Sequence, residues 1–170
     1  VHDDLRACSI ACVPPLIDSI NATGDKKIVK QLFDFSIKQL FTALSQEVEM
    51  DVVKTVAQSI KETILAACRP AGSTVDMTDF STAVPMLDAQ SLQFVFQQLV
   101  VAMRGSLQRR QTRKSERQVA EDYDEDDEEM DELCNQSEVE LLYFLHESIG
   151  AVIRTHGNSF LPAFVQEVLP

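Results

Sequence analysis

An apolar stripe near the start of the chain occurs twice more along the sequence, and this repeat constrains the fold more than any other feature. A shift of 48 residues superposes one apolar set on another: Leu5, Cys12, Leu16 and Ile20 on Val53, Ile60, Ile64 and Cys68. A shift of 133 residues does so at a third place: Cys8, Cys12, Leu16 and Ile20 on Leu141, Leu145, Ile149 and Ile153, with Gly24 on Gly157. The three segments are therefore expected to be equivalent helices.

The spacing and content of the repeat predict an α-solenoid. Apolar residues recur every three or four positions, which is the period of a helix, and strand signals are nearly absent. A period of about 40 to 47 residues with two helices each is typical of HEAT repeats, whose antiparallel helix pairs are expected to stack in a right-handed superhelix. We expect a single all-α HEAT-repeat fragment of a longer protein with these parts: 1–24, the B helix of a first repeat; 25–69, a complete repeat; 70–157, a repeat with a long loop and a basic-acidic insertion at about 104–136; and 158–170, the start of the next A helix.

Local signals set the expected limits of the helices. Pro14-Pro15 lies inside the first helix and removes backbone hydrogen bonds, so we expect a bend there. Asp25 can cap the second helix, and Arg69-Pro70 should end the third. Ser137 and Glu140 fit a capping box, so a fifth helix is expected to begin at Ser137.

Charge is concentrated in one segment of the chain. The formal net charge is -12, from 27 acidic and 15 basic residues, and residues 121–132 hold ten carboxylates and no basic side chain. Because a chain of this charge repels a phosphate backbone, we expect no binding of nucleic acid. No apolar run reaches the roughly 20 residues of a membrane-spanning helix, so we also expect no insertion into a membrane.

The acidic run follows a basic cluster at the end of a helix predicted over residues 87–118. We expect residues from about 120 to 136 to be a disordered insertion, or at most a protruding extension of that helix, because so charged a segment buries little apolar surface. The basic cluster resembles a nuclear localisation patch, although neutralisation by the neighbouring acidic run is the favoured interpretation. Its members are Arg109, Arg110, Arg113, Lys114 and Arg117. Calcium binding is not expected, because Asp127 stands where an EF-hand loop needs glycine.

Metal and enzyme chemistry have little support in the sequence. Three of the four cysteines, among them Cys8 and Cys12, lie in apolar helical patterns and are expected to be buried free thiols. His146 and Glu147 begin an HExxH pattern, but Gly150 stands where the second zinc ligand belongs. No glycine-rich phosphate loop or nucleophile turn is present, so we expect no enzyme, no cofactor and no metal site.

Two groups of residues resemble a known family. Residues 3–8 and 51–54 look like the acidic-apolar-basic opening of a HEAT B helix. The more specific match is an order of features: residues 117–125, the acidic run, a B helix, and then Phe160 to Phe164 leading to Pro170. This order is similar to the central and C-terminal solenoid of importin-beta-type nuclear transport receptors, or karyopherins, most like the branch of importin-5, also called importin beta-3. The resemblance covers nearly all of the chain.

The resemblance implies a receptor of the cytoplasm, nucleus and nuclear pore that carries cargo in nuclear import. Such a receptor would bind basic cargo signals on its inner B-helix surface and release them on binding Ran-GTP. It would also contact phenylalanine-glycine repeats of nucleoporins. A generic HEAT-repeat scaffold for protein interactions is the alternative, and an enzyme with an unrecognised distributed site is a third possibility.

The candidate partner-binding residues are all acidic. Glu62 and Glu147 are related by a shift of 85 residues, and each lies across its helix from the apolar stripe, so we expect them on one exposed ladder. The acidic run could attract the same basic partners, and its candidate residues are Asp122, Asp124, Glu125, Asp126, Asp127, Glu128 and Glu129. An ordinary solvated face and a solubilising loop are the alternatives for these two sites.

Overall fold

The computed structural model of the chain describes residues 2–71, 82–119 and 125–168. In these ranges all regular structure is helical and no strand occurs. The elements in chain order are α1 (Asp3–Ala11), α2 (Val13–Ala22), α3 (Lys26–Gln46), α4 (Met50–Cys68), α5 (Ala89–Val119), α6 (Glu125–His156), the 3-10 turn η2 (Gly157–Ser159) and α7 (Leu161–Val168). No helix in the described ranges is long and apolar enough to cross a membrane.

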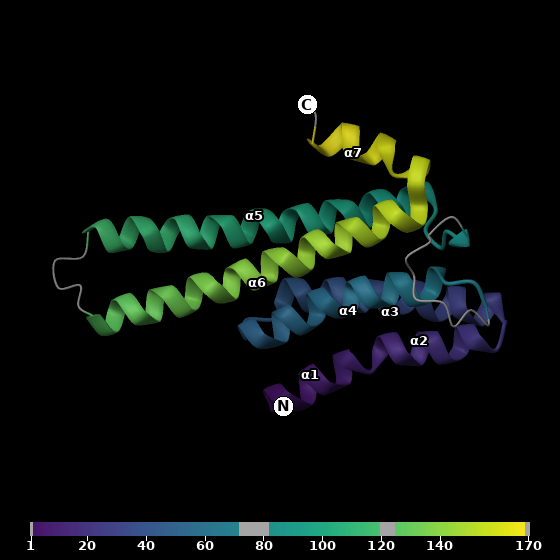
Figure 1. Cartoon of the computed structure of the whole chain (residues 1–170), viewed down its shortest axis with the longest axis horizontal. Coiled ribbons are helices and arrows are strands. Elements are labelled where there is room, and N and C mark those ends of the chain that lie inside the picture. The colour runs from purple at the N-terminus through teal and green to yellow at the C-terminus, as the bar shows by residue number, and fades with distance from the viewer. Residues whose placement is uncertain (1, 72–81, 120–124, 169–170) are drawn as a thin grey trace.

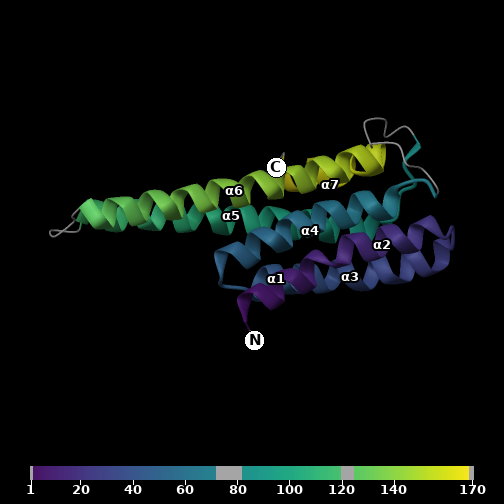
Figure 2. The same ribbon diagram turned by 60° about the horizontal axis from the view of Figure 1, so that its bottom comes forward.

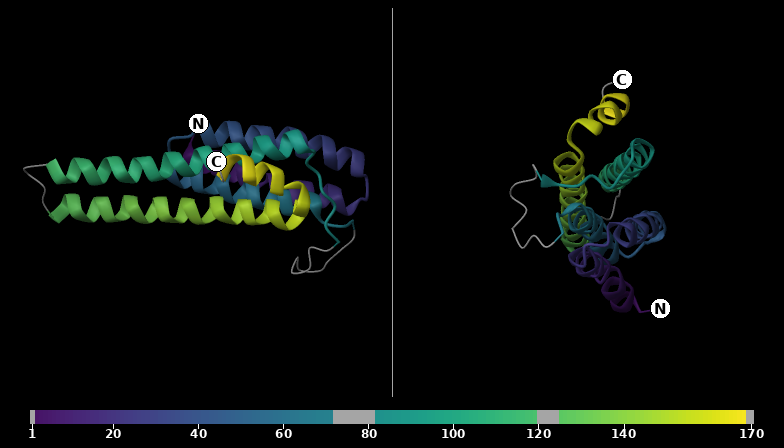
Figure 3. Two further views of the ribbon diagram at one scale, coloured as in Figure 1. Left: turned by 90° about the horizontal axis from the view of Figure 1, so that it is seen from above. Right: turned by 90° about the vertical axis from the view of Figure 1, so that its right-hand side faces the viewer.

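The helices form two layers of stacked antiparallel pairs, as the repeat predicts. Seen end-on, α2, α4 and α6 follow one another in one layer, and α3, α5 and α7 lie beside them in the other (Figure 3, right). Helix α4 packs against α2 on one side and α6 on the other, while α5 contacts α3 and α7. The all-α HEAT-type architecture is therefore confirmed.

The repeat is also visible in polar contacts of the B-helix layer. Asp3 pairs with Arg6 at 2.9 Å in α1, and Asp51 pairs with Lys54 at 2.8 Å in α4, at positions related by the 48-residue shift. The Lys54 ammonium also reaches a carboxylate of the next B helix, Glu140 of α6, at 2.9 Å. Equivalent positions thus occupy equivalent places in successive repeats.

At the predicted bend the first helix is interrupted at one residue, Cys12. Helix α1 ends at Ala11 and α2 begins at Val13, which places Pro14 and Pro15 in the first turn of α2. Proline is tolerated there because the first backbone N–H groups of a helix have no intrahelical partner. The turn into α3 uses Gly24 at φ 81°, and Asp25 caps α3 by accepting hydrogen bonds from two backbone N–H groups.

The core lies around α4, where eleven of the 19 residues are buried. Its central side chains Val56, Ile60 and Ile64 are fully inaccessible and contact a single cluster shared with α2, α3, α5 and α6. Burial on this scale contributes about 1.5–3 kcal/mol for each large aliphatic side chain. The stack is therefore held mainly by apolar contacts.

The apolar stripe predicted for the first helix is not the face that packs on the core. Cys8 and Cys12 are exposed, and Leu5 and Leu16 are 62% and 51% accessible. The buried face of this segment instead presents Ile17 and its neighbours to α4. The prediction that Cys8 and Cys12 are core thiols is therefore wrong, because in the described structure only one face of α1 and α2 has a neighbouring helix.

Helices α5 and α6 are much longer than the other pair and form an arm. They contain 31 and 32 residues, against 21 and 19 in α3 and α4. Their distal halves lie antiparallel and extend beyond the ends of α3 and α4 (Figures 1 and 2). Helix α6 begins at Glu125 rather than at Ser137, so the predicted capping-box start is wrong and residues 125–136 are helical. Residues 120–124 of the predicted insertion lie outside the described ranges.

A polar anchor joins α2 to the C-terminal end of α4. The buried Asn21 amide donates to the carbonyl oxygens of Ala66 and Arg69 at 2.9 and 2.8 Å. The Lys26 ammonium approaches the same Arg69 carbonyl at 3.4 Å and donates to the Asn21 side-chain oxygen at 2.8 Å. These contacts satisfy carbonyl groups that the end of a helix leaves without partners.

A second polar junction links the end of α6 to the segment before α5. The Leu87 backbone N–H donates to Nε2 of the buried His156 at 3.0 Å. Nε2 can accept only if the ring proton is on Nδ1, which lies 2.7 Å from the Thr155 hydroxyl. Burial lowers the pKa of His156, which keeps the imidazole neutral and able to accept.

Candidate functional site

The charged residues of the α5–α6 arm are divided between two faces of α5. Arg109 and Arg113 are one helical turn apart and point to a buried carboxylate of α6. Arg110, Lys114 and Arg117 follow a different line along α5 and border an open groove. The face with Arg109 and Arg113 therefore joins α5 to α6, and the other face borders the groove.

The carboxylate of Glu138 is the polar centre of the closed face. Its side chain is completely inaccessible, and Arg109 binds it with two hydrogen bonds, at 2.7 Å from Nε and 3.0 Å from an Nη atom. The Ser106 hydroxyl donates to the same carboxylate, and Arg113 lies 3.6 Å away. A buried charge is tolerated only when it is paired and hydrogen-bonded in this way.

The protonation state of Glu138 follows from these contacts. Burial alone raises the pKa of a carboxyl group, but the hydrogen bonds from Arg109 and Ser106 and the charges of both arginines outweigh burial here. The pKa of Glu138 therefore lies below its ordinary value, and the residue is a carboxylate at neutral pH.

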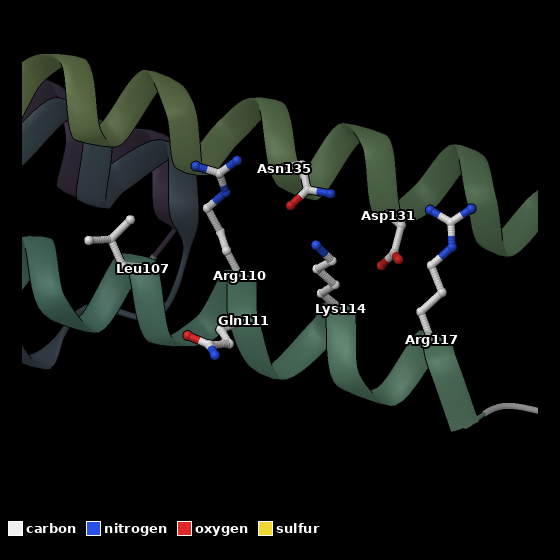
Figure 4. Close-up of a pocket in the computed structure, with 7 residues that line it drawn as sticks. All are labelled: Leu107, Arg110, Gln111, Lys114, Arg117, Asp131 and Asn135. Carbon is white, nitrogen blue, oxygen red and sulfur yellow. The ribbon is translucent and has the colours of Figure 1, made fainter.

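The open face of α5 borders a groove of about 780 Å³ between α5 and α6. Arg110, Lys114 and Arg117 extend from α5 towards α6, and Asp131 and Asn135 extend from α6 into the same space (Figure 4). Leu107 lies at the end of the groove nearer the stack. The groove thus combines three cations, one carboxylate, two neutral amides and one leucine.

The described part of the acidic run forms the first turns of α6. Asp127, Glu128 and Glu129 are exposed, and Glu128 accepts a hydrogen bond from Arg117 at 2.7 Å. The expected neutralisation of the basic cluster by the acidic run thus occurs at this pair. Glu125 and Asp126 belong to α6, and the candidate residues Asp122 and Asp124 lie outside the described ranges.

The two predicted ladder residues lie on neighbouring helices of the same layer. Glu62 is on α4 and Glu147 on α6, and both are half-buried rather than fully exposed. Gln58 lies one turn before Glu62 on the same helix, and its amide donates to the Glu62 carboxylate at 2.8 Å. Each carboxylate retains some accessible surface, which is the requirement for contact with a basic partner.

The role of Glu138 was not predicted from the sequence, because this position was expected in the first turn of a new helix. A usable signal was present in the pattern of α5, where the polar residues Ser106, Arg109 and Arg113 recur at helical spacing and so lie on one face. Such a polar stripe on the inner face of a helical hairpin requires an acid on the facing helix.

Cysteine and histidine residues form no metal centre in the described ranges, where no group of three potential ligands converges. Cys68 is buried, and burial raises the pKa of its thiol to about 11, so it remains protonated. Cys8 and Cys12 are exposed free thiols on α1 and its C-terminal cap.

Comparison with known families adds one finding. The family model described as Importin repeat 6 matches residues 77–170, more than half of the chain. The chain belongs to the importin repeat 6 family. No curated protein and no solved structure matched the chain.

The importin repeat match includes all of α5, α6 and α7. The arm with its buried Glu138, the open groove and the acidic start of α6 therefore all lie within the matched segment. The family consists of scaffold repeats of transport receptors rather than of enzymes. Membership in this family supports protein partners as the ligands of this chain.

Proposed function

We propose that this chain is a part of a nuclear transport receptor of the importin-5 branch that binds basic cargo signals and Ran-GTP. The observation that carries the proposal is the importin repeat 6 match over residues 77–170, on a stack of HEAT-type helix pairs. A receptor of this kind would shuttle between cytoplasm and nucleus through the nuclear pore.

The acidic start of α6 is the proposed contact for basic partners. Glu129 and Glu132 are exposed there, and neither belongs to an ion pair in the described ranges. A cluster of carboxylates of one sign raises the rate at which a basic protein meets the surface. Glu62 and Glu147 are proposed as secondary contacts within the B-helix layer.

A groove between α3 and α5 is the proposed contact for phenylalanine-glycine repeats. It has a volume of about 670 Å³, and its lining combines the apolar Ile37, Leu87, Phe94 and Val95 with polar and charged side chains such as Lys30, Asp34 and Asp88. Phe94 is 40% exposed and packs edge-to-face on Phe41, with ring centroids 6.0 Å apart. A partly open aromatic ring on an apolar floor can pair with an incoming phenylalanine.

The central test measures binding of the chain to Ran loaded with a non-hydrolysable GTP analogue, with Ran-GDP as the comparison. We expect the GTP form to bind more tightly and the rate of association to fall as salt is added. Equal, negligible binding of both nucleotide forms would favour the alternative, a HEAT-repeat scaffold with other partners.

A matched pair of variants tests the acidic contact. Glu129→Gln with Glu132→Gln removes two charges from the start of α6 and should slow association with Ran-GTP or a basic peptide by several-fold at low salt. Asp4→Asn with Glu49→Gln removes two exposed charges from α1 and the α3–α4 connection and should leave the rate nearly unchanged. Equal rates for both double variants would exclude α6 as the site of contact.

A further inference from the structure

Arg110 and Lys114 line the groove and, unlike Arg109, Arg113 and Arg117, form no ion pair in the described ranges. Arg109 and Arg113 are bound to Glu138, and Arg117 is bound to Glu128. Among the described residues, Arg110 and Lys114 take part in no ion pair, although the facing helix is rich in acids. Their positive charge is therefore available within the groove.

The facing surface of α6 contributes only one carboxylate to the described lining of the groove. Asn135 and Asp131 are the residues of α6 that line the groove. Asn135 is neutral, while the carboxylate of Glu138 is used on the other face of α5. The groove therefore has an excess of positive charge on a chain that is strongly acidic as a whole.

The spacing of the two cations indicates the spacing of the acidic groups that a ligand would need. Arg110 and Lys114 are four residues apart on one helix, which places their side chains on the same face about 5–6 Å apart at Cβ. Two carboxylates four residues apart on a partner helix have the same spacing. Leu107, 51% exposed at the proximal end of the groove, offers an apolar contact one turn earlier.

The surroundings of the groove limit the length of an acidic ligand. The groove lies next to the start of α6, where Asp127, Glu128 and Glu129 are exposed and Glu128 binds the groove residue Arg117. A long polyanion such as a nucleic acid, or an anionic membrane surface, would lie against these carboxylates and be repelled. A short acidic peptide can engage the cations without reaching them.

We propose that the groove between α5 and α6 binds a short acidic peptide segment of a partner protein. Two carboxylates one helical turn apart pair with Arg110 and Lys114, and an apolar side chain rests on Leu107. Gln111 and Asn135 supply neutral hydrogen-bonding groups along the groove. This site is distinct from the acidic contact for basic partners and does not depend on it.

The test uses the full chain and a short fluorescent peptide with two glutamates one helical turn apart and a leucine one turn further. We expect saturable binding by fluorescence anisotropy that weakens with salt. The variant Arg110→Gln with Lys114→Gln should weaken binding by about tenfold. The matched control, Lys27→Gln with Lys38→Gln on exposed positions of α3, should bind as the unaltered chain does.

Two further measurements address the identity of the ligand. Asp131→Asn removes the carboxylate from the groove and should strengthen binding of the peptide. Peptides in which glutamine replaces both glutamates should not bind. Circular dichroism of each variant checks that its helix content is unchanged.

Three results would overturn the proposal. The first is equal loss of affinity in the groove variant and the α3 control, which would indicate a non-specific charge effect. The second is binding of the glutamine peptide as tightly as the glutamate peptide. The third is displacement of the peptide by single-stranded RNA or anionic lipid vesicles at comparable concentrations, which would indicate a polyanion surface instead.

Discussion

The proximal and distal halves of the α5–α6 hairpin are held together by different forces. Near the stack, α5 buries apolar side chains such as Val95 and Leu99 against α6, which contributes Leu141 and Leu145. Beyond Leu99, Ser106 is the one buried residue of α5 among those described, and it donates to a carboxylate. A helix pair can thus extend past its apolar core when an internal ion cluster replaces apolar contact.

The largest expected difference between the two halves comes from truncating an apolar side chain of the stack. Leu145→Ala leaves a cavity at a fully inaccessible position and should lower the free energy of unfolding by about 3 kcal/mol. Val139→Ala, at an exposed position of the same helix, should cost less than about 0.5 kcal/mol. Urea unfolding of both variants measures the difference, and equal midpoints would contradict the assigned register of α6.

A smaller effect is expected from the ion cluster of the arm. Glu138→Gln removes a buried carboxylate, but the Arg109 side chain is 48% accessible to water, so the free energy of unfolding should fall by about 2 kcal/mol. Hydrogen exchange should accelerate in the distal parts of α5 and α6 before it does in α4. In the control Glu140→Gln, which breaks a more exposed pair with Lys54, the arm should keep its protection. Uniform acceleration in all helices would mean that the arm is not an independent unit.

A third prediction is that the two halves of the hairpin lose stability at different pH values. Burial lowers the pKa of His156 in the folded chain. Its contribution to the free energy of unfolding is therefore complete above the pKa of histidine in the unfolded chain, about 6.5, and is lost as the pH falls below that value. The pKa of Glu138 is also lowered. Its contribution to the free energy of unfolding is therefore lost only below the pKa of glutamate in the unfolded chain, about 4.3. On acidification the α5–α6 junction should weaken first, and the arm later.

The measurement for this prediction is the free energy of unfolding at several pH values. The His156→Gln variant should lose the pH dependence near pH 6, while His146→Gln, at an exposed position, should keep it. Identical pH profiles for the unaltered chain and His156→Gln would refute the role of the neutral imidazole.

The smallest expected effect is at the surface pair of Arg117 and Glu128. Both side chains are largely accessible, so Arg117→Gln should change the free energy of unfolding by less than about 1 kcal/mol. High salt should abolish even this difference. A larger effect would mean that the arm relies on its outer charges as well as on Glu138.

The fold class could be predicted from the sequence because apolar spacing and helix ends are local signals. Asp25 caps α3 as expected, and both Gly24 and Gly157 adopt positive φ at the predicted ends. The face of the first helix could not be assigned in the same way. Periodicity identifies an apolar stripe, but it does not say whether another helix covers Leu5 and Cys8.

The first helix of the arm was expected to reach about residue 118, but the helical order of residues 125–136 could not be predicted, because it depends on contacts between residues far apart in sequence. Net charge predicts disorder for an isolated acidic segment, whereas Glu138 is paired with arginines 29 and 25 positions earlier. The open groove could not be predicted from the sequence either, because it depends on how the basic residues of α5 are divided between two faces of the helix. The acidic candidates of α6 remain predictions as binding residues.

The anchor at Asn21 has a mechanical consequence for the stack. A solenoid flexes through small rotations of each helix pair against the next, and a fixed point determines where such a rotation can pivot. Asn21 and Lys26 both bind the carbonyl of Arg69, so the first two B helices are tethered at one end. At the opposite ends of these helices, the ion pair of Arg6 with Glu47 is the contact that a change in curvature would have to break.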